Sequence, residues 1–508
     1  MIKTLSQALR MDKERFKVPK SVQQAIPIQR IWPDGIFQQG TKFSKTYRFT
    51  DINYYIASKD NKTEMFLDYS ELLNSLDSGI SAKITINNRR INKEEFEKSI
   101  LLPMKEDGLD HYREEYNEML LSKITGTNNS IYQERYLTVS VHKRSIDDAR
   151  TYFARIGTDI VTHLAKLSST AEGLDAESRL QIFRDFFKGD VPQAFPFDLK
   201  QFAKKGTSFK DWMCPDSMEF ERDHFKIGDR YGRVLYMQDY ASYVKDDMIS
   251  ELCDFSRNLI LSIDILPVPT DEAVREIQNK LLGVETNVTN WQRRQNENNN
   301  FSATIPYEME LQRTETKEML NDLTTRDQRM MFGVLTIVHM ADSYKELNSD
   351  TETLKSIARK NLCQLSTLRW QQMDGLHTAL PFGPRKINAL RTLTTESTAV
   401  LIPFHTQEIM QEGGIYYGQN AVSKNMIVVD RKKLLNGNSF RLGVSGSGKS
   451  FSAKEEIVAL ALATEDDILI LDPESEFGNL TVALGGEVVK VSATSGMHLN
   501  AMDMDSSY

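Results

Sequence analysis

The stretch Gly443-Val444-Ser445-Gly446-Ser447-Gly448-Lys449-Ser450 decides how this end of the chain should fold, because it satisfies the phosphate-loop pattern G-x-x-x-x-G-K-[ST]. Glycines let the backbone curl tightly, so that amide N–H groups can point inward at phosphate oxygens. In this pattern the lysine sits at the β- and γ-phosphates and the hydroxyl of Ser450 ligates Mg²⁺. A helix that begins at the loop directs its positive dipole end at the anion. The stretch therefore predicts a site for a nucleoside triphosphate with Mg²⁺.

The residues around the loop support this interpretation. Ser439 to Leu442 resembles a short strand, 452–463 favours a helix, and Ile468 to Leu471 is an apolar run typical of a strand buried in a parallel sheet. Strand, loop, helix and strand make one βαβ unit, although Arg441 places a charge where the strand should be apolar. The alternative is a glycine-serine turn that binds nothing. The expected binding residues are Gly443, Val444, Ser445, Gly446, Ser447, Gly448, Lys449, Ser450 and Phe451, with Ser450 as the metal ligand.

The bulk composition is that of an ordinary globular protein. The chain has 508 residues, room for roughly three domains, and is 40% hydrophobic and 26% charged. A net charge of -8 argues against a surface that coats nucleic acid throughout. Cys214, Cys253 and Cys363 are widely separated, so we expect core thiols rather than a disulfide framework or a zinc site. No stretch approaches 18 uninterrupted apolar residues, so no transmembrane helix is expected.

The N-terminal part predicts a basic arm followed by a domain of strands and helices. Residues 1–30 carry seven Lys or Arg against Asp12 and Glu14, which indicates a solvated arm or a contact with anionic lipid. Hydrophobic periodicity predicts strands at 52–56, 82–86, 136–141, 234–237, 259–265 and 330–339, and helices along 112–124, 146–164 and 180–187. This alternation predicts an α/β sandwich in which helices cover a sheet.

The following segments predict a helical hairpin and then short strands. The polar stretch from Thr270 to Met319 should form the hairpin, with its tip at 293–300. A helix capped at Ser349 or Asp350 should bury a stripe that includes Leu362, and His339 is interpreted as a core residue. Further strands are expected at 398–402, 414–418 and 426–429, with a hairpin turn at 419–425. The strand–helix passages 136–167 and 330–362 are candidates for related halves of one domain. The domain prediction is an arm at 1–45, an α/β domain at 46–268, the hairpin with a strand–helix unit at 269–390, and the first part of a P-loop domain at 391–508.

Several blocks in fixed order make the chain similar to a known family. They are Gly414-Ile-Tyr-Tyr-Gly418-Gln-Asn420, the stretch from Asn438 to Phe451, Asp472-Pro-Glu474-Ser-Glu476-Phe477, Leu484-Gly-Gly486-Glu-Val, and His498-Leu-Asn500-Ala-Met-Asp503. In these blocks the chain resembles the conjugative-transfer ATPases of type IV secretion systems, the TraE/TrbE/CagE class, particularly those of mobile elements in Gram-positive bacteria. The N-terminal half matches that family in layout more than in motifs.

The resemblance implies a RecA/HerA-like P-loop NTPase domain behind the N-terminal α/β domain. It also implies ATP as ligand, a homo-oligomer when full length, other conjugation subunits as partners, and a peripheral place at the cytoplasmic face of the cell membrane. Family motors need a later Walker B strand ending in Asp-Glu, yet 58 residues follow Ser450 (508 minus 450). Asp472 ends the first strand expected after the loop helix, whereas the metal-side carboxylate normally lies on a later strand. We therefore expect an incomplete P-loop domain, very weak ATP hydrolysis, and no assignable catalytic residue.

The predicted function is an ATP-binding motor subunit that energises channel or pilus assembly and DNA transfer. Two alternatives belong to other classes. One is a non-enzymatic scaffold that docks secretion components, and the other is a HerA/FtsK-type pump for duplex DNA. The pump would require strong, salt-dependent DNA binding, which the acidic balance of the chain disfavours.

Overall fold

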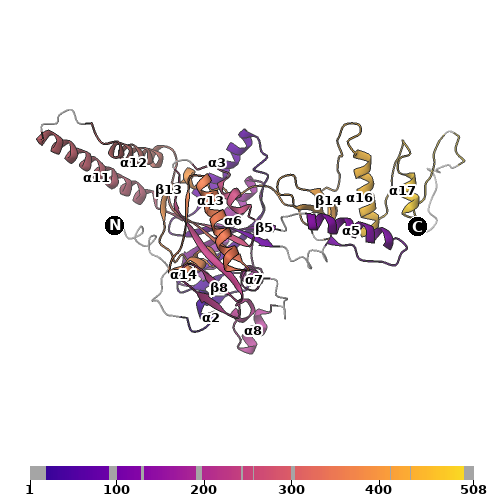
Figure 1. Cartoon of the computed structure of the whole chain (residues 1–508), viewed down its shortest axis with the longest axis horizontal. Helices are drawn as coiled ribbons and strands as arrows, with labels where there is room; N and C mark the ends of the chain where they lie inside the picture. Colours follow the sequence, from indigo (N-terminus) through magenta and orange to yellow (C-terminus); the bar gives the residue numbers. More distant parts are fainter. Residues whose placement is uncertain are drawn as a thin grey trace. The chain divides into compact units, whose positions relative to one another are not determined.

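The computed structural model describes residues 19–90, 100–126, 131–189, 197–241, 244–255, 257–298, 304–411, 413–434, 436–492 and 494–496. Residues 1–18 of the expected basic arm, the end of the hairpin tip and the block from His498 to Asp503 lie outside these residues. The chain divides into two compact units (Figure 1). The first unit comprises Met1–Arg90 and Ile131–Gln407, and the second comprises Ile91–Ser130 and Glu408–Tyr508. Among the described helices, none has both the length and the apolar character needed to cross a membrane.

The first unit is built on a large antiparallel sheet, so the protein is a mixed α/β protein. The main order of its strands is β1-β2-β3-β5-β4-β10-β11-β9-β8-β7, with β6 paired to β3, β12 to β9 and β13 to β11. The strands are β1 (Arg30–Ile31), β2 (Phe37–Gln39), β3 (Lys42–Phe49), β4 (Ser81–Arg90), β5 (Ile131–His142), β6 (Ala171–Gly173), β7 (Met218–Phe220), β8 (Phe225–Ile227), β9 (Arg230–Asp239), β10 (Leu259–Pro267), β11 (Met330–Ala341), β12 (Gln364–Thr367) and β13 (Arg391–Thr394).

Strand order and connections show that this sheet consists of two similar halves. The first half runs β3-α3-β4-β5-α6-β6 with spatial order β6-β3-β5-β4, and the second runs β9-α10-β10-β11-α13-β12 with order β12-β9-β11-β10. Each half is thus a βαββαβ unit of the split βαβ type. The halves meet where β4 pairs antiparallel with β10. The expectation that 136–167 and 330–362 correspond agrees with this topology, since they hold β5-α6 and β11-α13.

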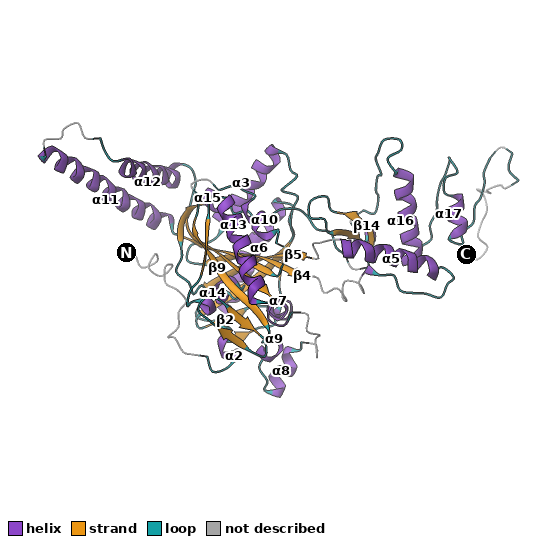
Figure 2. Ribbon diagram, viewed as in Figure 1, coloured by secondary structure: helices purple, strands orange, loops and turns teal. Residues whose placement is uncertain are grey.

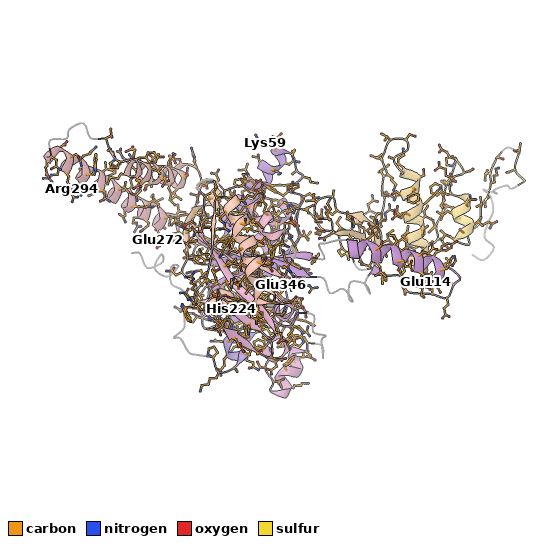
Figure 3. All side chains as sticks on the ribbon, in the orientation of Figure 1. Lys59, Glu114, His224, Glu272, Arg294 and Glu346 are labelled. Atoms are coloured by element: carbon orange, nitrogen blue, oxygen red, sulfur yellow. The ribbon has the colours of Figure 1, made fainter. Side chains whose placement is uncertain are left out.

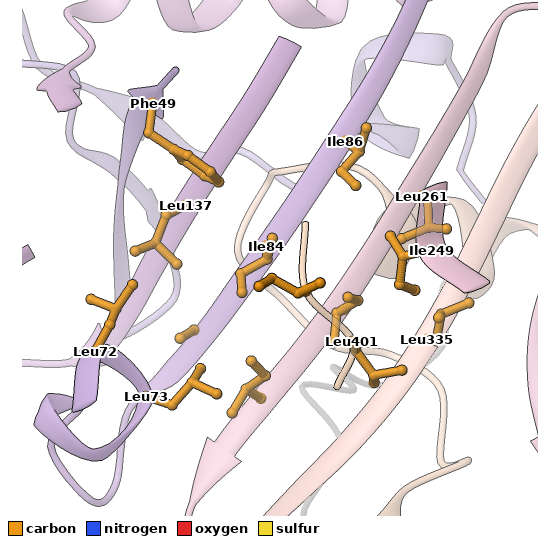
Figure 4. Close-up of a cluster of buried hydrophobic side chains, with 14 of the residues drawn as sticks. Phe49, Leu72, Leu73, Ile84, Ile86, Leu137, Ile249, Leu261, Leu335 and Leu401 are labelled. Atoms are coloured by element: carbon orange, nitrogen blue, oxygen red, sulfur yellow. The ribbon is translucent and has the colours of Figure 1, made fainter. Parts of the chain in front are cut away.

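Helices cover both faces of the sheet (Figure 2). They are α2 (Val22–Ala25), α3 (Lys59–Ser75), α6 (Ile146–Lys166), α7 (Ala176–Lys188), α8 (Leu199–Lys205), α9 (Lys210–Met213), α10 (Met248–Cys253), α13 (Tyr344–Lys360), α14 (Gln372–Ala379) and α15 (Thr395–Ala399). On one face, α3, α6, α10 and α13 bury the larger apolar cluster, in which Ile84, Leu137, Leu261 and Leu335 come from four neighbouring strands (Figure 4). On the other face, α7, α9 and α14 contribute to a second cluster that contains Phe183, Trp212 and Leu376.

The second face also buries a layer of polar side chains. Thr46 contacts Thr138 at 2.9 Å, and Thr85 contacts Ser262 at 2.9 Å, all four being fully buried. The alternating pattern predicts strands with one polar, half-exposed face. The structure corrects this expectation for the central strands, because the segment 378–387 covers their polar face and accepts hydrogen bonds from it.

The predicted helical hairpin is confirmed by α11 (Thr270–Glu297) and α12 (Tyr307–Thr325), which are inserted between β10 and β11. The two helices pack along each other. In Figure 3, Glu272 lies at the base of α11 and Arg294 near its far end. Glu285 of α11 bridges to α12 through Arg313 at 2.8 Å and Lys317 at 3.0 Å.

The second unit combines the insertion between β4 and β5 with the last hundred residues. Its described elements are α5 (Asp110–Gly126), β14 (Ile415–Gln419), β15 (Met426–Val429), the 3₁₀-helix η1 (Arg431–Lys433), α16 (Lys449–Ala463) and α17 (Gly478–Ala483). The expected strands at 414–418 and 426–429 form the antiparallel pair β14-β15, with the predicted turn between them. A small apolar cluster joins Leu120 of α5 to Met426 and Val428 of β15.

Three expectations about the type or the start of an element in the first unit are wrong. Residues 52–56 form a turn rather than a strand, because the carboxylate of Asp51 accepts N–H bonds from His405 at 2.8 Å and Thr406 at 3.0 Å and holds this segment as a loop. Residues 398–402 are not a strand, because Thr394 caps the short helix α15. Helix α13 begins at a Ser343 cap instead of Ser349 or Asp350, since Ser343 accepts a hydrogen bond from the backbone of Glu346.

Candidate phosphate-binding site

The residues from Gly443 to Gly448 form an exposed loop that leads directly into α16, as the pattern predicts. The N-cap of the helix is Gly448, with φ of 89°, and Gly446 has φ of 78°. Both values lie in the left-handed region that glycine adopts without a steric penalty. The N–H of Ser447 donates to the carbonyl of Val444 at 3.2 Å, which closes a turn inside the loop. The glycines are therefore placed where the backbone needs them.

Lys449 and Ser450 occupy the first two positions of α16. The ammonium of Lys449 donates to the carbonyl of Gly443 at 2.7 Å, so the side chain folds back over the loop. Because the N-cap is glycine, no side chain caps the first N–H groups of the helix. An uncapped helix start beneath a lysine is a suitable place for an anion. Val444 and Phe451 are 78% and 75% exposed.

Glu456, two turns further along α16, fastens the helix to the segments around it. Its carboxylate accepts hydrogen bonds from the hydroxyl of Tyr417 at 2.7 Å and from Arg441 at 2.5 Å, and it pairs with Arg431 at 3.0 Å. Burial and the bond to Glu456 raise the pKa of Tyr417. The charge of Arg441, which does not fit a buried strand, is thus explained by its partner on α16. Sequence reasoning missed Glu456, although the charge of Arg441 in an expected strand indicated that it had an acidic partner.

Arg113 of α5 holds the other end of α16. Its fully buried guanidinium donates to the backbone carbonyl of Leu462 at 3.1 Å and pairs with Asp107 and Asp110. The hydrogen bonds to Asp107 and Asp110 raise the pKa of Arg113, and the bond to Arg113 lowers the pKa of Asp107. Nothing in the sequence linked residue 113 to the loop, because 349 residues separate it from Leu462.

The strands expected on either side of the loop are not formed. Residues 439–442 and 468–471 run without strand pairing, and Phe440, Leu442, Leu469 and Leu471 are 89–93% exposed. A strand that is apolar on both faces is stable only when neighbouring strands pair with it and other layers cover it. Among the described residues of the second unit, only β14 and β15 pair as strands. The βαβ unit predicted around the loop is therefore corrected to a loop and helix without its sheet.

Asp472 contributes to local turn structure. Its carboxylate accepts the N–H of Phe477 at 2.8 Å, and backbone N–H groups of the same turn lower its pKa. Glu474 and Glu476 are exposed. Within the described residues, no group of three or more His, Cys, Asp or Glu side chains is arranged to hold a metal ion.

Other residues singled out by the sequence are structural. His339 is fully buried in β11, with Nε2 3.1 Å from the hydroxyl of Thr351, which agrees with its interpretation as a core residue. The cysteines are free and buried, as expected. Leu362, expected in the core, is 81% exposed.

The chain matches no protein-family model, and no curated protein is significantly similar to it.

Proposed function

We propose that this chain is an ATP-binding motor subunit of a conjugative type IV secretion system. In that role it would supply the ATP-binding part of a motor that energises channel or pilus assembly and DNA transfer, at the cytoplasmic face of the membrane and together with other secretion subunits. One observation carries the ATP-binding part of the proposal: the phosphate-loop sequence lies in an exposed turn at the uncapped start of α16, with Lys449 at the first helical position. The secretion role rests on the resemblance of the sequence blocks between Gly414 and Asp503 to the conjugative-transfer ATPases.

The residues fit a triphosphate in three respects. The positive φ angles at Gly446 and Gly448 bend the loop, and the uncapped N–H groups at the start of α16 can donate to phosphate oxygens. The ammonium of Lys449 is held by one backbone carbonyl, that of Gly443, and can exchange this contact for a phosphate. Ser450 is exposed and can present its hydroxyl to Mg²⁺, which would bridge the phosphates.

Hydrolysis is expected to be very weak. Phosphoryl transfer by P-loop enzymes uses a Walker B carboxylate at the metal and a residue that positions water. The acid closest in sequence to that role, Asp472, caps its own turn through the N–H of Phe477. The proposal for this chain is therefore binding, with turnover no faster than that of a loop variant.

Titration of the full chain with a fluorescent mant-ATP probe and Mg²⁺ tests the proposal. Lys449→Ala should weaken binding roughly tenfold or more, since a hydrogen bond to a charged group contributes about 1.5–3 kcal/mol. Lys490→Ala, which removes an exposed lysine outside the loop, is the matched control and should bind normally. Absence of binding by the folded chain, or equal binding by the Lys449→Ala variant, would refute the proposal.

A docking scaffold remains the second candidate function, because the first unit carries most of the chain and has its own core. A scaffold would bind its secretion partners equally with and without ATP. A comparison of partner binding by wild type and Lys449→Ala at saturating ATP separates the two functions.

A further inference from the structure

The two halves of the first unit carry different residues at one corresponding position, directly after the C-cap of α6 or α13. After α13, the N–H of Cys363 donates to the carbonyl of Ala358 at 2.9 Å and the N–H of Leu362 donates to that of Arg359 at 2.9 Å. After α6, Ser169 and Ser168 make the same two bonds, to Leu164 and Ala165. Both are Schellman ends, in which the left-handed residue is usually glycine. That residue is Ser168 in the first half and Leu362 in the second, with φ of 62° and 55°.

Leu362 is an unusual choice for this position. A side chain in left-handed conformation costs roughly 1–2 kcal/mol, and burial does not offset the cost because Leu362 is 81% exposed. Trp370 repeats the combination eight residues later, with φ of 62° and 77% exposure. Two large apolar side chains are thus exposed to water on residues whose backbone conformation is unfavourable. Such outliers point to a functional requirement.

The strand between these two residues is an open edge of the sheet. Within the described part of the chain, β12 pairs only with β9. The N–H of Leu368 donates to Val234 of β9 at 3.2 Å, so the alternation of an antiparallel ladder directs the N–H and C=O of Leu365 and Thr367 away from β9. Such an edge can accept another strand.

A basic hollow of about 780 Å³ lies along this edge. Its lining includes Lys355, Arg359, Arg369, Leu362 and Asp239.

Its charges are only partly balanced. Glu352 pairs with Lys355 at 3.0 Å and with Arg359 at 3.5 Å, and Arg391 pairs with Asp239. With Arg369, the neighbourhood holds four cations against two carboxylates, in a chain whose net charge is -8.

We propose that β12 is a docking edge for an extended, acidic segment of a partner protein, which adds to the sheet as a further strand. The backbone of Leu365 and Thr367 would pair with the segment, Lys355, Arg359 and Arg369 would face its carboxylates, and Leu362 and Trp370 would anchor its ends. This is strand addition, in which main-chain bonds give affinity and side chains give specificity. A second copy of the chain fits less well, because two basic edges would repel each other.

Fluorescence anisotropy with two labelled peptides tests the proposal on the full chain. One peptide alternates glutamate with valine, and the other alternates lysine with valine. Only the glutamate peptide should bind, and added salt should weaken its binding. Thr367→Pro removes one outward N–H while sparing the pairing with β9. Thr367→Pro and Leu362→Ser, which copies Ser168 of the other half, should each weaken binding roughly fivefold or more.

A second pair of variants tests whether the positive charge beside β12 is needed for binding. Arg369→Glu should abolish binding of the glutamate peptide, whereas Arg293→Glu on α11, an equally large charge change at a 79% exposed side chain, should not. The proposal is overturned if neither peptide binds, if both bind equally, or if the folded Leu362→Ser and Arg369→Glu variants bind as well as wild type. It is also overturned if sedimentation shows that the wild-type chain is a dimer and that the Thr367→Pro variant is a monomer.

Discussion

Lys83 of β4 and Asp264 of β10 are register partners across the joint between the two halves of the sheet, with 3.7 Å between Nζ and Oδ1. Both side chains are at most 1% exposed. Lys83 also donates to the carbonyl of Leu380 at 3.1 Å and to that of Thr378. The pair therefore joins both halves to the segment that covers their polar face.

Removing one member of this pair should destabilise the first unit strongly. Lys83→Met or Asp264→Leu leaves an opposite charge buried without its ion partner, which costs about 3–5 kcal/mol. The double variant Lys83→Met/Asp264→Leu should lose less free energy of unfolding than the two single variants lose together, because neither charge of the pair remains. Urea unfolding followed by circular dichroism measures these differences. If the loss of stability in the double variant equals the sum of the two single losses, the two side chains do not stabilise each other.

His339 should make the protein less stable in acid. Burial, together with nearby Arg233, lowers the pKa of His339 to about 3, whereas an unfolded histidine has a pKa of about 6.5. Between these two pH values the unfolded chain binds a proton at residue 339 and the folded chain does not. His339 therefore has no effect on the free energy of unfolding above about pH 6.5, and it lowers that free energy increasingly as the pH falls towards 3. The slope from this residue approaches about 1.4 kcal/mol per pH unit. His339→Gln should flatten the pH dependence of unfolding in this range, and an unchanged slope would contradict the assignment.

Glu456 should matter for nucleotide binding although it lies outside the phosphate-loop pattern. Its removal in Glu456→Ala frees Tyr417, Arg431 and Arg441, so the segment leading into the loop loses its attachment to α16. We expect a lower melting temperature and weaker binding of mant-ATP. Glu487→Ala, at an exposed position, is the control and should change neither. Wild-type binding by Glu456→Ala would show that the loop does not depend on this attachment.

Leu362→Gly should stabilise the protein, because glycine adopts φ of 55° without the steric cost of a side chain. The gain should be about 1 kcal/mol in the free energy of unfolding. Leu362→Ala keeps the Cβ atom and should gain little. If the edge strand is a docking site, Leu362→Gly should also lose peptide affinity, so stability and binding would change in opposite directions. Equal stabilities of the glycine and alanine variants would contradict the strain.

The spacing of residues within a segment correctly predicted several helices and strands. The strands at 82–86, 136–141 and 259–265 and the helix after the phosphate loop form where their residue spacing favours that element, and the hairpin helices form along the polar stretch that predicted them. The left-handed glycines of the loop belong to the same group, since Gly446 and Gly448 need no distant partner.

Expectations failed where a partner distant in sequence determines the outcome. Residues 52–56 alternate like a strand, yet Asp51 binds the backbone at His405 and Thr406. The apolar runs at 439–442 and 468–471 have the composition of strands, yet no described strand pairs with them. Strand pairing is a property of two segments, so a single segment cannot establish it.

The sequence by itself determined the glycine-rich turn before α16, the hairpin helices, several other helices and the central strands, because these depend on contacts within one element or on its own periodicity. Only the tertiary structure decided the duplicated βαββαβ arrangement, the buried pairing of Lys83 with Asp264, and the exposure of Leu362 beside an open edge. These features depend on which strands lie next to each other. That choice is made by packing and burial across the whole sheet rather than by any local stretch of residues.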